Sequence, residues 1–325
     1  ATHKDFHGFN GLLGILSENS RFSSMGNEAF APNAQTNAQA IYIFEKFNLA
    51  EHKISFALRR GEHQIDSIEQ KTFSTHNVSV GDEYHLNEMW TVKASLNHLE
   101  RAPSYYELFS NGIHAAVGQY IVGNSSIKRE KSNGLDLYLK RASATNATSF
   151  KAYYNYFNSY IGLFNTGNLI NIDSEYWNEN MYKSVKASFK GFELESKQFI
   201  TDNLNANLRS EYVVAINEDS NTYLPRIAPL KISLGATYQK ERYSFNLNVL
   251  HGFPQNKLAY NELKTDAYTN LSAWATYQVL VPQNIEVYVK ANNLLNHEIR
   301  EATSYIKDIA PQGGRSIMVG LLWNF

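Results

Sequence analysis

Hydrophobic and polar residues alternate with a period of two in many segments of the chain. In Ile317–Phe325, every odd-numbered position is apolar, whereas the even-numbered positions include Gly320 and Asn324. The same alternation occurs in Ile285–Asn292, Tyr243–Val249, Leu230–Tyr238, Leu135–Lys140 and Trp90–Leu96. A period of two places successive side chains on opposite faces of a β-strand. The pattern therefore predicts an all-β protein whose strands each carry one apolar face.

The connections between the predicted strands alternate between short and long. Counting alternating segments gives about fourteen strands. The short links are Leu49–His52, Asp82–Asn87, Ser143–Ala147, Thr201–Asn203, Gln239–Arg242 and Leu280–Asn284. The long links are Arg21–Thr36, Glu62–Thr72, Glu100–Lys131, Asn165–Lys183, Asn217–Pro229, Gly252–Thr265 and Asn296–Gly314. Tight periplasmic turns and long extracellular loops are typical of a transmembrane antiparallel β-barrel, with the apolar faces toward lipid. The final strand then runs down to the periplasm, and the first starts near His7 on that side.

The composition agrees with a barrel and excludes several other classes of protein. The 325 residues contain 13% aromatic residues, no cysteine and a formal net charge of -1. The absence of cysteine excludes disulfide scaffolds and thiolate metal sites, and the balanced charge argues against nucleic-acid binding. No apolar run is long enough for a membrane-spanning helix. Aromatic residues gather near strand ends, as in Tyr153–Tyr160, where amphipathic rings suit the membrane interfaces.

Enzyme signatures are missing from the sequence. The chain contains no G-x-S-x-G, P-loop, H-E-x-x-H or dinucleotide-binding motif. Serine, histidine and aspartate occur in the predicted loops, but no spacing singles out a catalytic set. We therefore expect a protein that is not an enzyme and that holds no permanently bound cofactor.

A segment in the longest predicted loop resembles a known family. Glu100–Phe109 reads E-R-A-P-S-Y-Y-E-L-F and is similar to the R-A-P-S-x-x-E-L-[YF] segment in the barrel of TonB-dependent outer-membrane receptors. Further similar stretches follow in the family's order: Val122–Asn124, Glu130–Asn133, Lys190–Glu195, Leu224–Pro229, Asn292–Asn296 and Pro311–Arg315. The collinear order, over about two-thirds of the chain, gives the resemblance its weight.

The resemblance has consequences for the architecture and the partners. The family barrel has about 22 strands and follows an N-terminal plug, so residues 1–325 look like the C-terminal portion of such a barrel, with the plug and first strands absent. A closed fourteen-stranded barrel is the alternative. The resemblance implies the outer membrane of a Gram-negative bacterium, contact with its lipid, and TonB as a partner through a TonB box in the absent N-terminal part. It also implies recognition of the terminal Phe325 by the barrel insertion machinery.

Several residues of the family-like motifs are expected to have structural roles. Pro103 cannot donate to a β-ladder and marks the exit from a strand, next to Arg101 and Glu107 of the same motif. Gly191 interrupts the apolar parity of its strand and suggests a β-bulge. Asn293 belongs to the N-N-L-L-N stretch.

Within the family, the chain is most similar to the subgroup of the zinc-uptake receptor. The similarity is carried by Gly112–Ala116, Tyr120–Asn124 and Gln255–Glu262. It implies that His114 is a ligand of transported zinc, which an imidazole can hold. His63 and His297, each beside acidic residues, are further candidate ligands, although a solvated rim explains both. No local four-ligand cluster exists, so a metal site has to be assembled from several loops.

These observations predict a receptor that takes up a scarce nutrient through extracellular loops and a plugged barrel. Zinc, another metal or a metal complex is the expected substrate, and a siderophore or haem is the alternative. A passive fourteen-stranded porin is a second alternative, against which the Arg101–Phe109 motif argues. An adhesin would also use long loops, but has no sequence feature of its own here.

Overall fold

The structure, a computed structural model, describes residues 2–6, 8–26, 29–280 and 285–323. All strands belong to one 18-stranded sheet. Four strands are short: β1 (Thr2–Phe6), β7 (Asn111–His114), β8 (Gln119–Val122) and β13 (Thr222–Tyr223). The other fourteen are β2 (Phe9–Phe22), β3 (Ala34–Leu49), β4 (His52–Asp66), β5 (Gln70–His85), β6 (Trp90–Arg101), β9 (Glu130–Ala142), β10 (Asn146–Ile172), β11 (Glu175–Thr201), β12 (Leu204–Asn217), β14 (Lys231–Lys240), β15 (Tyr243–Gly252), β16 (Tyr268–Leu280), β17 (Ile285–Asn292) and β18 (Ser316–Trp323). The predicted all-β antiparallel fold is confirmed.

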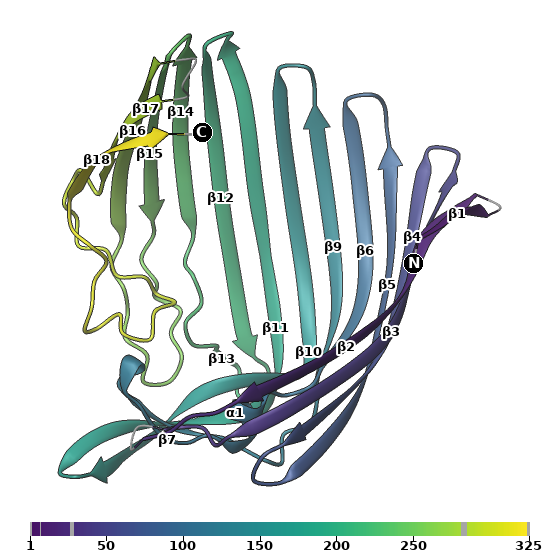
Figure 1. Ribbon diagram of the computed structural model, residues 1–325, viewed down its shortest axis with the longest axis vertical. Helices are drawn as coiled ribbons and strands as arrows, with labels where there is room; N and C mark the ends of the chain where they lie inside the picture. The colour runs from purple at the N-terminus through teal and green to yellow at the C-terminus, as the bar shows by residue number, and fades with distance from the viewer. Residues whose placement is uncertain (1, 7, 27–28, 281–284, 324–325) are drawn as a thin grey trace.

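Each long strand pairs antiparallel with the next long strand along the chain. β6 pairs with β9 because the intervening segment folds into helix α1 (Tyr105–Phe109), the β7–β8 hairpin and the 3₁₀ turn Ala115–Val117. β8 adds to β11 in parallel. The sheet curves strongly, with short turns along one edge and long connections along the other (Figure 1). Within the described residues, no pairing joins β18 to β1 or β2, so the curved sheet is open.

The loop prediction is correct at most connections and wrong at two. Glu62–Thr72 and Asn165–Lys183 were expected to be long loops, but β4–β5 and β10–β11 continue as paired strands through them. The β10–β11 hairpin ends in a two-residue turn at Asp173 and Ser174, whose φ values are 51° and 68°. The parts of strands that extend beyond the lipid need no apolar side chains on their outer face. Alternation of apolar and polar residues therefore cannot reveal them. His7, residues 281–284 of the Leu280–Asn284 link and Phe325 lie outside the described residues.

The two faces of the sheet differ as the alternation predicts. One face carries exposed apolar side chains, among them Ile15 (85% exposed), Leu96 (63%) and Val319 (68%). The opposite, concave face carries polar and charged side chains; Lys93 lies 2.6 Å from Glu83, and both line a cavity on this face. Exposed apolar residues outside and ion pairs inside are the arrangement of a lipid-facing barrel wall. Among the described residues, no helix is long and apolar enough to cross a membrane.

The buried apolar residues lie at the edge with the long connections. One cluster places Leu108 and Phe109 of α1 on Ile65, Ile127 and Ile161. A second cluster packs Leu224 of the β12–β14 connection on Ala187 and Ala215, and the rings of Phe157, Tyr160 and Phe189 lie against it. These two small cores fix the loops to the barrel wall and therefore position whatever the loops bind.

Gly191 does not form the predicted bulge. It pairs in unbroken register with Tyr153 of β10 and Val213 of β12. The alternation of apolar and polar positions shifts next to Gly191 because the Phe189 side chain packs against the buried cluster on the concave face. A side chain at Gly191 would overlap the Tyr153 ring and a backbone carbonyl of β12. The same cross-strand arrangement of a glycine under a tyrosine ring occurs at four pairs: Gly14–Tyr42, Gly191–Tyr153, Gly252–Tyr268 and Gly320–Tyr288.

Candidate functional site

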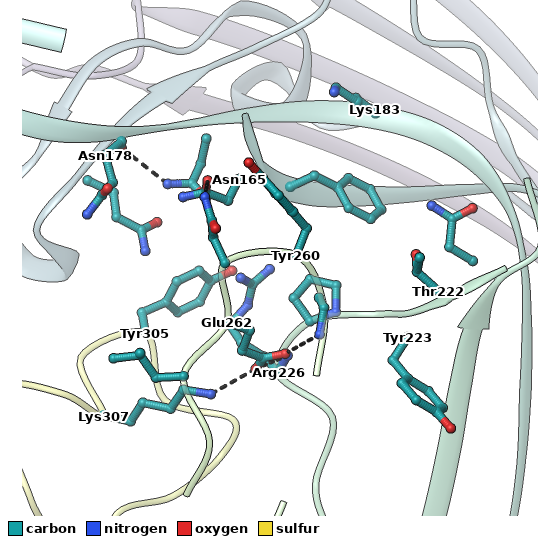
Figure 2. A pocket seen from close by; sticks show the side chains of 18 of the residues that line it. Asn165, Asn178, Lys183, Thr222, Tyr223, Arg226, Tyr260, Glu262, Tyr305 and Lys307 are labelled. Carbon is teal, nitrogen blue, oxygen red and sulfur yellow. Dashed lines mark hydrogen bonds and ion pairs between the residues drawn. The ribbon is translucent and has the colours of Figure 1, made fainter. Parts of the chain in front are cut away.

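A cavity of about 700 Å³ lies among the long connections. Its wall combines the upper part of the β10–β11 hairpin with the β12–β14, β15–β16 and β17–β18 connections. Figure 2 shows Asn165 and Asn178 of the hairpin facing Glu262 and Tyr305 of the connections across this space, with Tyr260 beside Asn165. We call this cavity the loop pocket. Its size falls within the range of small-molecule binding sites.

A buried ion pair closes one side of the loop pocket. Lys307 Nζ lies 2.8 Å from Glu262 Oε1, and the two side chains are only 9% and 7% exposed. The Glu262 carboxylate also accepts the backbone N–H groups of Arg226 (2.9 Å) and Ala259 (3.1 Å). Three different connections therefore meet at the Glu262 carboxylate. These contacts supply the ion pair and the hydrogen bonds that a buried charge requires.

Arg226 ties the same group to the hairpin and to an aromatic ring. Its guanidinium donates to the Leu163 carbonyl at 2.9 Å and lies 4.3 Å from the centre of the Tyr305 ring. Its backbone has a φ of 60°, a conformation that non-glycine residues rarely adopt. These contacts hold the Arg226 side chain at the pocket wall.

The rest of the pocket wall is rich in amides and hydroxyls. The amide side chains are Gln119, Asn165, Asn178, Asn180, Asn217 and Asn261, and the hydroxyls belong to Ser220, Thr222, Tyr223, Tyr260, Ser304 and Tyr305. Amides donate and accept at the same time, and tyrosine rings offer flat apolar surfaces with a polar end. Among the described lining residues there is no histidine. The wall therefore suits an organic molecule with carbonyl and hydroxyl groups better than a bare transition-metal ion.

The family-like motif at Arg101–Phe109 anchors the loop next to the pocket. Arg101 contacts Glu107 with two hydrogen bonds of 2.9 and 3.1 Å and Glu130 with two of 3.3 and 3.2 Å. Ser104 and Glu107 form a capping box at the start of α1, where the Ser104 N–H donates to Glu107 Oε2 at 2.7 Å. Pro103 is fully buried beside them. These residues contact the loop and the barrel wall rather than the pocket.

Asn293 and His297 form a second hydrogen-bond network with a structural role, just after β17. The Asn293 amide donates to the carbonyls of His297 (2.8 Å) and Gly313 (3.2 Å) and accepts the His297 N–H at 3.0 Å. The Nδ1 atom of His297 accepts the N–H of Thr269 at 2.9 Å. One ring nitrogen of this candidate ligand is therefore used in holding the β17–β18 connection to β16.

The structure places the other two candidate histidines on separate elements. His114 ends β7, pairs with Gln119 of β8, and packs edge-on against the Phe30 ring with centroids 4.3 Å apart. Its buried Nδ1 atom has no hydrogen-bond partner, and neither has Oε1 of Gln119. His63 lies within β4, paired with Ala38 and Phe73. Across the described part of the chain, no group of three histidine, aspartate or glutamate side chains is arranged to hold a metal ion.

Glu301 is an electrostatic anchor beside the pocket. It lies 2.8 Å from Lys231 Nζ and accepts the Tyr268 hydroxyl at 2.6 Å. Burial alone would raise the pKa of Glu301, but the bonds from Lys231 and Tyr268 outweigh it and hold the pKa below its ordinary value. The carboxylate stays charged at neutral pH and ties the β17–β18 connection to β14.

Sequence reasoning missed Arg226, Tyr260, Glu262, Tyr305 and Lys307 as pocket residues. Arg226 lies in Leu224–Pro229 and Glu262 ends Gln255–Glu262, two stretches that the resemblance had singled out. The signal was therefore present, but it indicated a strand entry for Leu224–Pro229 and a subgroup similarity for Gln255–Glu262, and not a shared pocket. The meeting of these residues depends on connections that lie far apart in sequence.

Known proteins share this architecture. The sequence profile of the TonB-dependent receptor-like β-barrel matches residues 3–294. Among solved structures, the copper transporter OprC is 18% identical, with a TM-score of 0.82 over 98% of this chain and 54% of its own. The FrpB iron transporter from Neisseria meningitidis (F3-3 variant) is 13% identical, with a TM-score of 0.76 over 98% and 53%.

A mutant of the ferric enterobactin receptor PfeA from Pseudomonas aeruginosa is 14% identical, with a TM-score of 0.65 over 98% of this chain and 59% of its own. The chain thus spans little more than half of the length of these structures. At such identities the structures support the fold, whereas the sequence profile, which covers most of the chain, identifies the family. The chain belongs to the TonB-dependent receptors, transport proteins of the Gram-negative outer membrane, and forms part of their β-barrel.

Proposed function

We propose that the protein takes up a metal as a complex with an organic chelator, and that the loop pocket binds this complex. The amide- and tyrosine-rich wall of a cavity of about 700 Å³ carries the proposal. The intact receptor would contain the N-terminal plug and the TonB-contacting segment expected from the sequence, and TonB would drive release into the periplasm. The proposal is in keeping with the metal, iron and ferric-chelate cargoes named for the similar structures.

The chemistry of the wall favours a chelate over a free ion. A zinc ion takes about four protein ligands, chiefly imidazole, thiolate and carboxylate. The loop pocket offers Glu262, whose charge is already paired with Lys307, and Asp308. Haem would be expected to use an axial histidine, and the described pocket wall has none. An organic chelate needs hydrogen bonds and flat contact surfaces, which this wall provides.

Tyr260 provides the sharpest test because its side chain is 68% exposed and lines the pocket. In the full-length receptor, we expect a ferric trihydroxamate or a ferric tricatecholate to bind, and Tyr260→Ala to weaken that binding about tenfold, the loss typical of a contact aromatic. Isothermal titration calorimetry with each chelate, and with zinc chloride alone, measures this. Tyr176→Ala is the matched control, since Tyr176 is 70% exposed on β11 but does not line the pocket.

Two outcomes would contradict the proposal. If zinc alone binds and neither chelate does, the substrate class is wrong. If a chelate binds equally well to the Tyr260→Ala and wild-type receptors, the loop pocket is not the binding site.

Free zinc at His114 is the second candidate function. The observation that favours it is the buried Nδ1 of His114, which has no partner; Gln119, the residue paired with His114 in the β7–β8 hairpin, also has an unpartnered buried Oε1. His63 and His297, the other candidate ligands, would have to approach from other elements. On this alternative, His114→Ala lowers zinc affinity in calorimetry, whereas under the chelate proposal the same substitution leaves zinc binding unchanged.

A further inference from the structure

A cluster of basic side chains lies on the outer surface of the barrel, away from the loop pocket. It consists of Arg60 (β4), His76 (β5), His98 (β6), Arg129 (before β9) and Lys131 (β9), which we call the outer basic cluster. The strand registers bring them together, since Arg60 pairs with His76 and the strand neighbours β5, β6 and β9 follow in order. The side chains of His76, His98, Arg129 and Lys131 are between 34% and 51% exposed.

A buried carboxylate holds the outer basic cluster together. The Glu100 side chain is only 4% exposed and lies 3.1 Å from Arg129 and 3.3 Å from Lys131. The same carboxylate lies 3.6 Å from His76 and 3.8 Å from His98, and accepts the backbone N–H of His76 at 3.0 Å. Glu100 therefore fixes four basic groups around one point of the wall and leaves their outer sides facing the surroundings.

The strand parity places the cluster on the lipid-facing side. Closer to the short turns, the same face of the same strands carries Leu58, Val78 and Leu96, two residues from Arg60, His76 and His98, and Leu135, four residues from Lys131. Of these, Leu96 is 63% exposed, as expected for the lipid-facing band. The cluster thus lies at the border of this band, on the side of the long connections, which is the extracellular side in this family.

Uncharged hydrogen-bonding groups continue the cluster sideways. On the same face, Asn133 of β9 contacts the His98 ring at 2.9 Å and donates to Asn158 of β10 at 3.1 Å. The fixed charges are Arg60, Arg129 and Lys131 against Glu100 and, one row further out, Glu62. Among the described residues Arg60 has no ion pair, which leaves its guanidinium available to an anion.

We infer that the outer basic cluster binds the phosphate groups of the phosphorylated glycolipid that forms the outer leaflet of this membrane. A guanidinium and an ammonium group next to one another recognise phosphate through short charge-assisted hydrogen bonds. The neighbouring asparagines suit the sugar to which the phosphate is attached. The exposed leucines below the cluster would contact the acyl chains of the same molecule. The ligand is therefore a lipid that joins sugar phosphate and acyl chains, not an ion from solution.

The test uses the full-length receptor purified in mild detergent and native mass spectrometry with added bisphosphorylated lipid A. We expect the double variant Arg60→Gln/Lys131→Gln to bind lipid A at least about tenfold more weakly, the loss typical of removing two charge-assisted contacts. The control is Lys93→Gln/Lys151→Gln, which removes two lysines from the concave face of the same wall. Wild-type binding should also fall when lipid A lacks one phosphate or is replaced by phosphatidylglycerol.

The possible results distinguish lipid A from other anionic lipids and from inorganic phosphate as the ligand of the outer basic cluster. Equal binding of lipid A to the cluster variant and to wild type would overturn the inference. Equal binding of lipid A and of phosphatidylglycerol would show that any anionic lipid suffices, and competition by inorganic phosphate alone would show that the acyl chains add nothing; both results reject the glycolipid. Heat-modifiability on gels confirms that each variant is folded, and Lys131→Arg, which keeps the charge, should retain binding.

Discussion

At the scale of single residues, Glu107 has two functions that can be separated by mutation. It neutralises Arg101 and closes the capping box of α1, and its side chain is 7% exposed. Glu107→Ala removes both, and we expect a local loss of about 2 kcal/mol, close to the cost of breaking a largely buried ion pair after allowing for the part-exposed arginine. Hydrogen exchange of residues 104–124 in the full-length receptor measures the loss.

Glu107→Gln is the matched control, because its amide oxygen can still accept the Ser104 N–H. We expect Glu107→Gln to cost less than Glu107→Ala. Equal protection of the loop in wild type and in Glu107→Ala would show that the buried Leu108 and Phe109, rather than the ion pairs, hold the loop in place.

The sequence allowed prediction of the residue-scale features that are local in the chain. Pro103 does mark a strand exit, as predicted. The S-x-x-E spacing of Ser104 and Glu107 is also a local capping-box signature, although no prediction was drawn from it. The partner Glu130 lies 29 positions from Arg101, and no local pattern links the two. For the same reason the meeting of Arg226, Glu262 and Lys307 was not predictable.

At the scale of elements, the glycine–tyrosine pairs make a distinct prediction. In Gly191→Ala the added methyl group would meet the Tyr153 ring and the backbone of β12, so one of them has to move. We expect a destabilisation of about 1–3 kcal/mol, as for overpacked sites. Refolding of the full-length receptor from urea into lipid vesicles measures the change.

Gly81→Ala is the control, because its nearest neighbour is the movable Ser55 hydroxyl at 2.9 Å. The double variant Gly191→Ala/Tyr153→Ala should recover part of the stability, since removing the ring makes room. An equal cost at Gly81 and Gly191 would mean that the loss of glycine itself, and not the tyrosine, sets the stability.

The strands were predictable in the lipid-facing band and less so outside it. Alternation identified about fourteen strands because lipid requires every second residue to be apolar. Above the band, β10 and β11 continue with polar residues such as Asn165 and Asn180, which still pair across the hairpin. Backbone pairing and polar side-chain contacts, such as those of Glu179 with Thr166 and Asn168, hold the strands there, and neither requires apolar residues to alternate.

At the scale of the whole molecule, the assignment of faces can be tested along β18. Val319 lies on the exposed apolar face, and Met318, its chain neighbour, on the concave face. The chain contains no cysteine, so Val319→Cys and Met318→Cys can carry a nitroxide in the receptor reconstituted in lipid. We expect oxygen, which concentrates in lipid, to relax the label at residue 319 more than a water-soluble nickel chelate does. Residue 318 should show a lower ratio; equal ratios would contradict the assignment.

The length of the β10–β11 hairpin determines where the extracellular surface can tolerate changes in sequence. Each of its strands has 27 residues, which at about 3.3 Å per residue amounts to roughly 90 Å of strand, while the whole bilayer is about 40–45 Å thick. Its tip at Asp173 and Ser174 is therefore remote from the lipid. A peptide inserted at that turn would leave every ladder of the wall intact. The sequence of this turn can therefore change, and with it the surface that antibodies and phages meet, while the β-sheet stays intact.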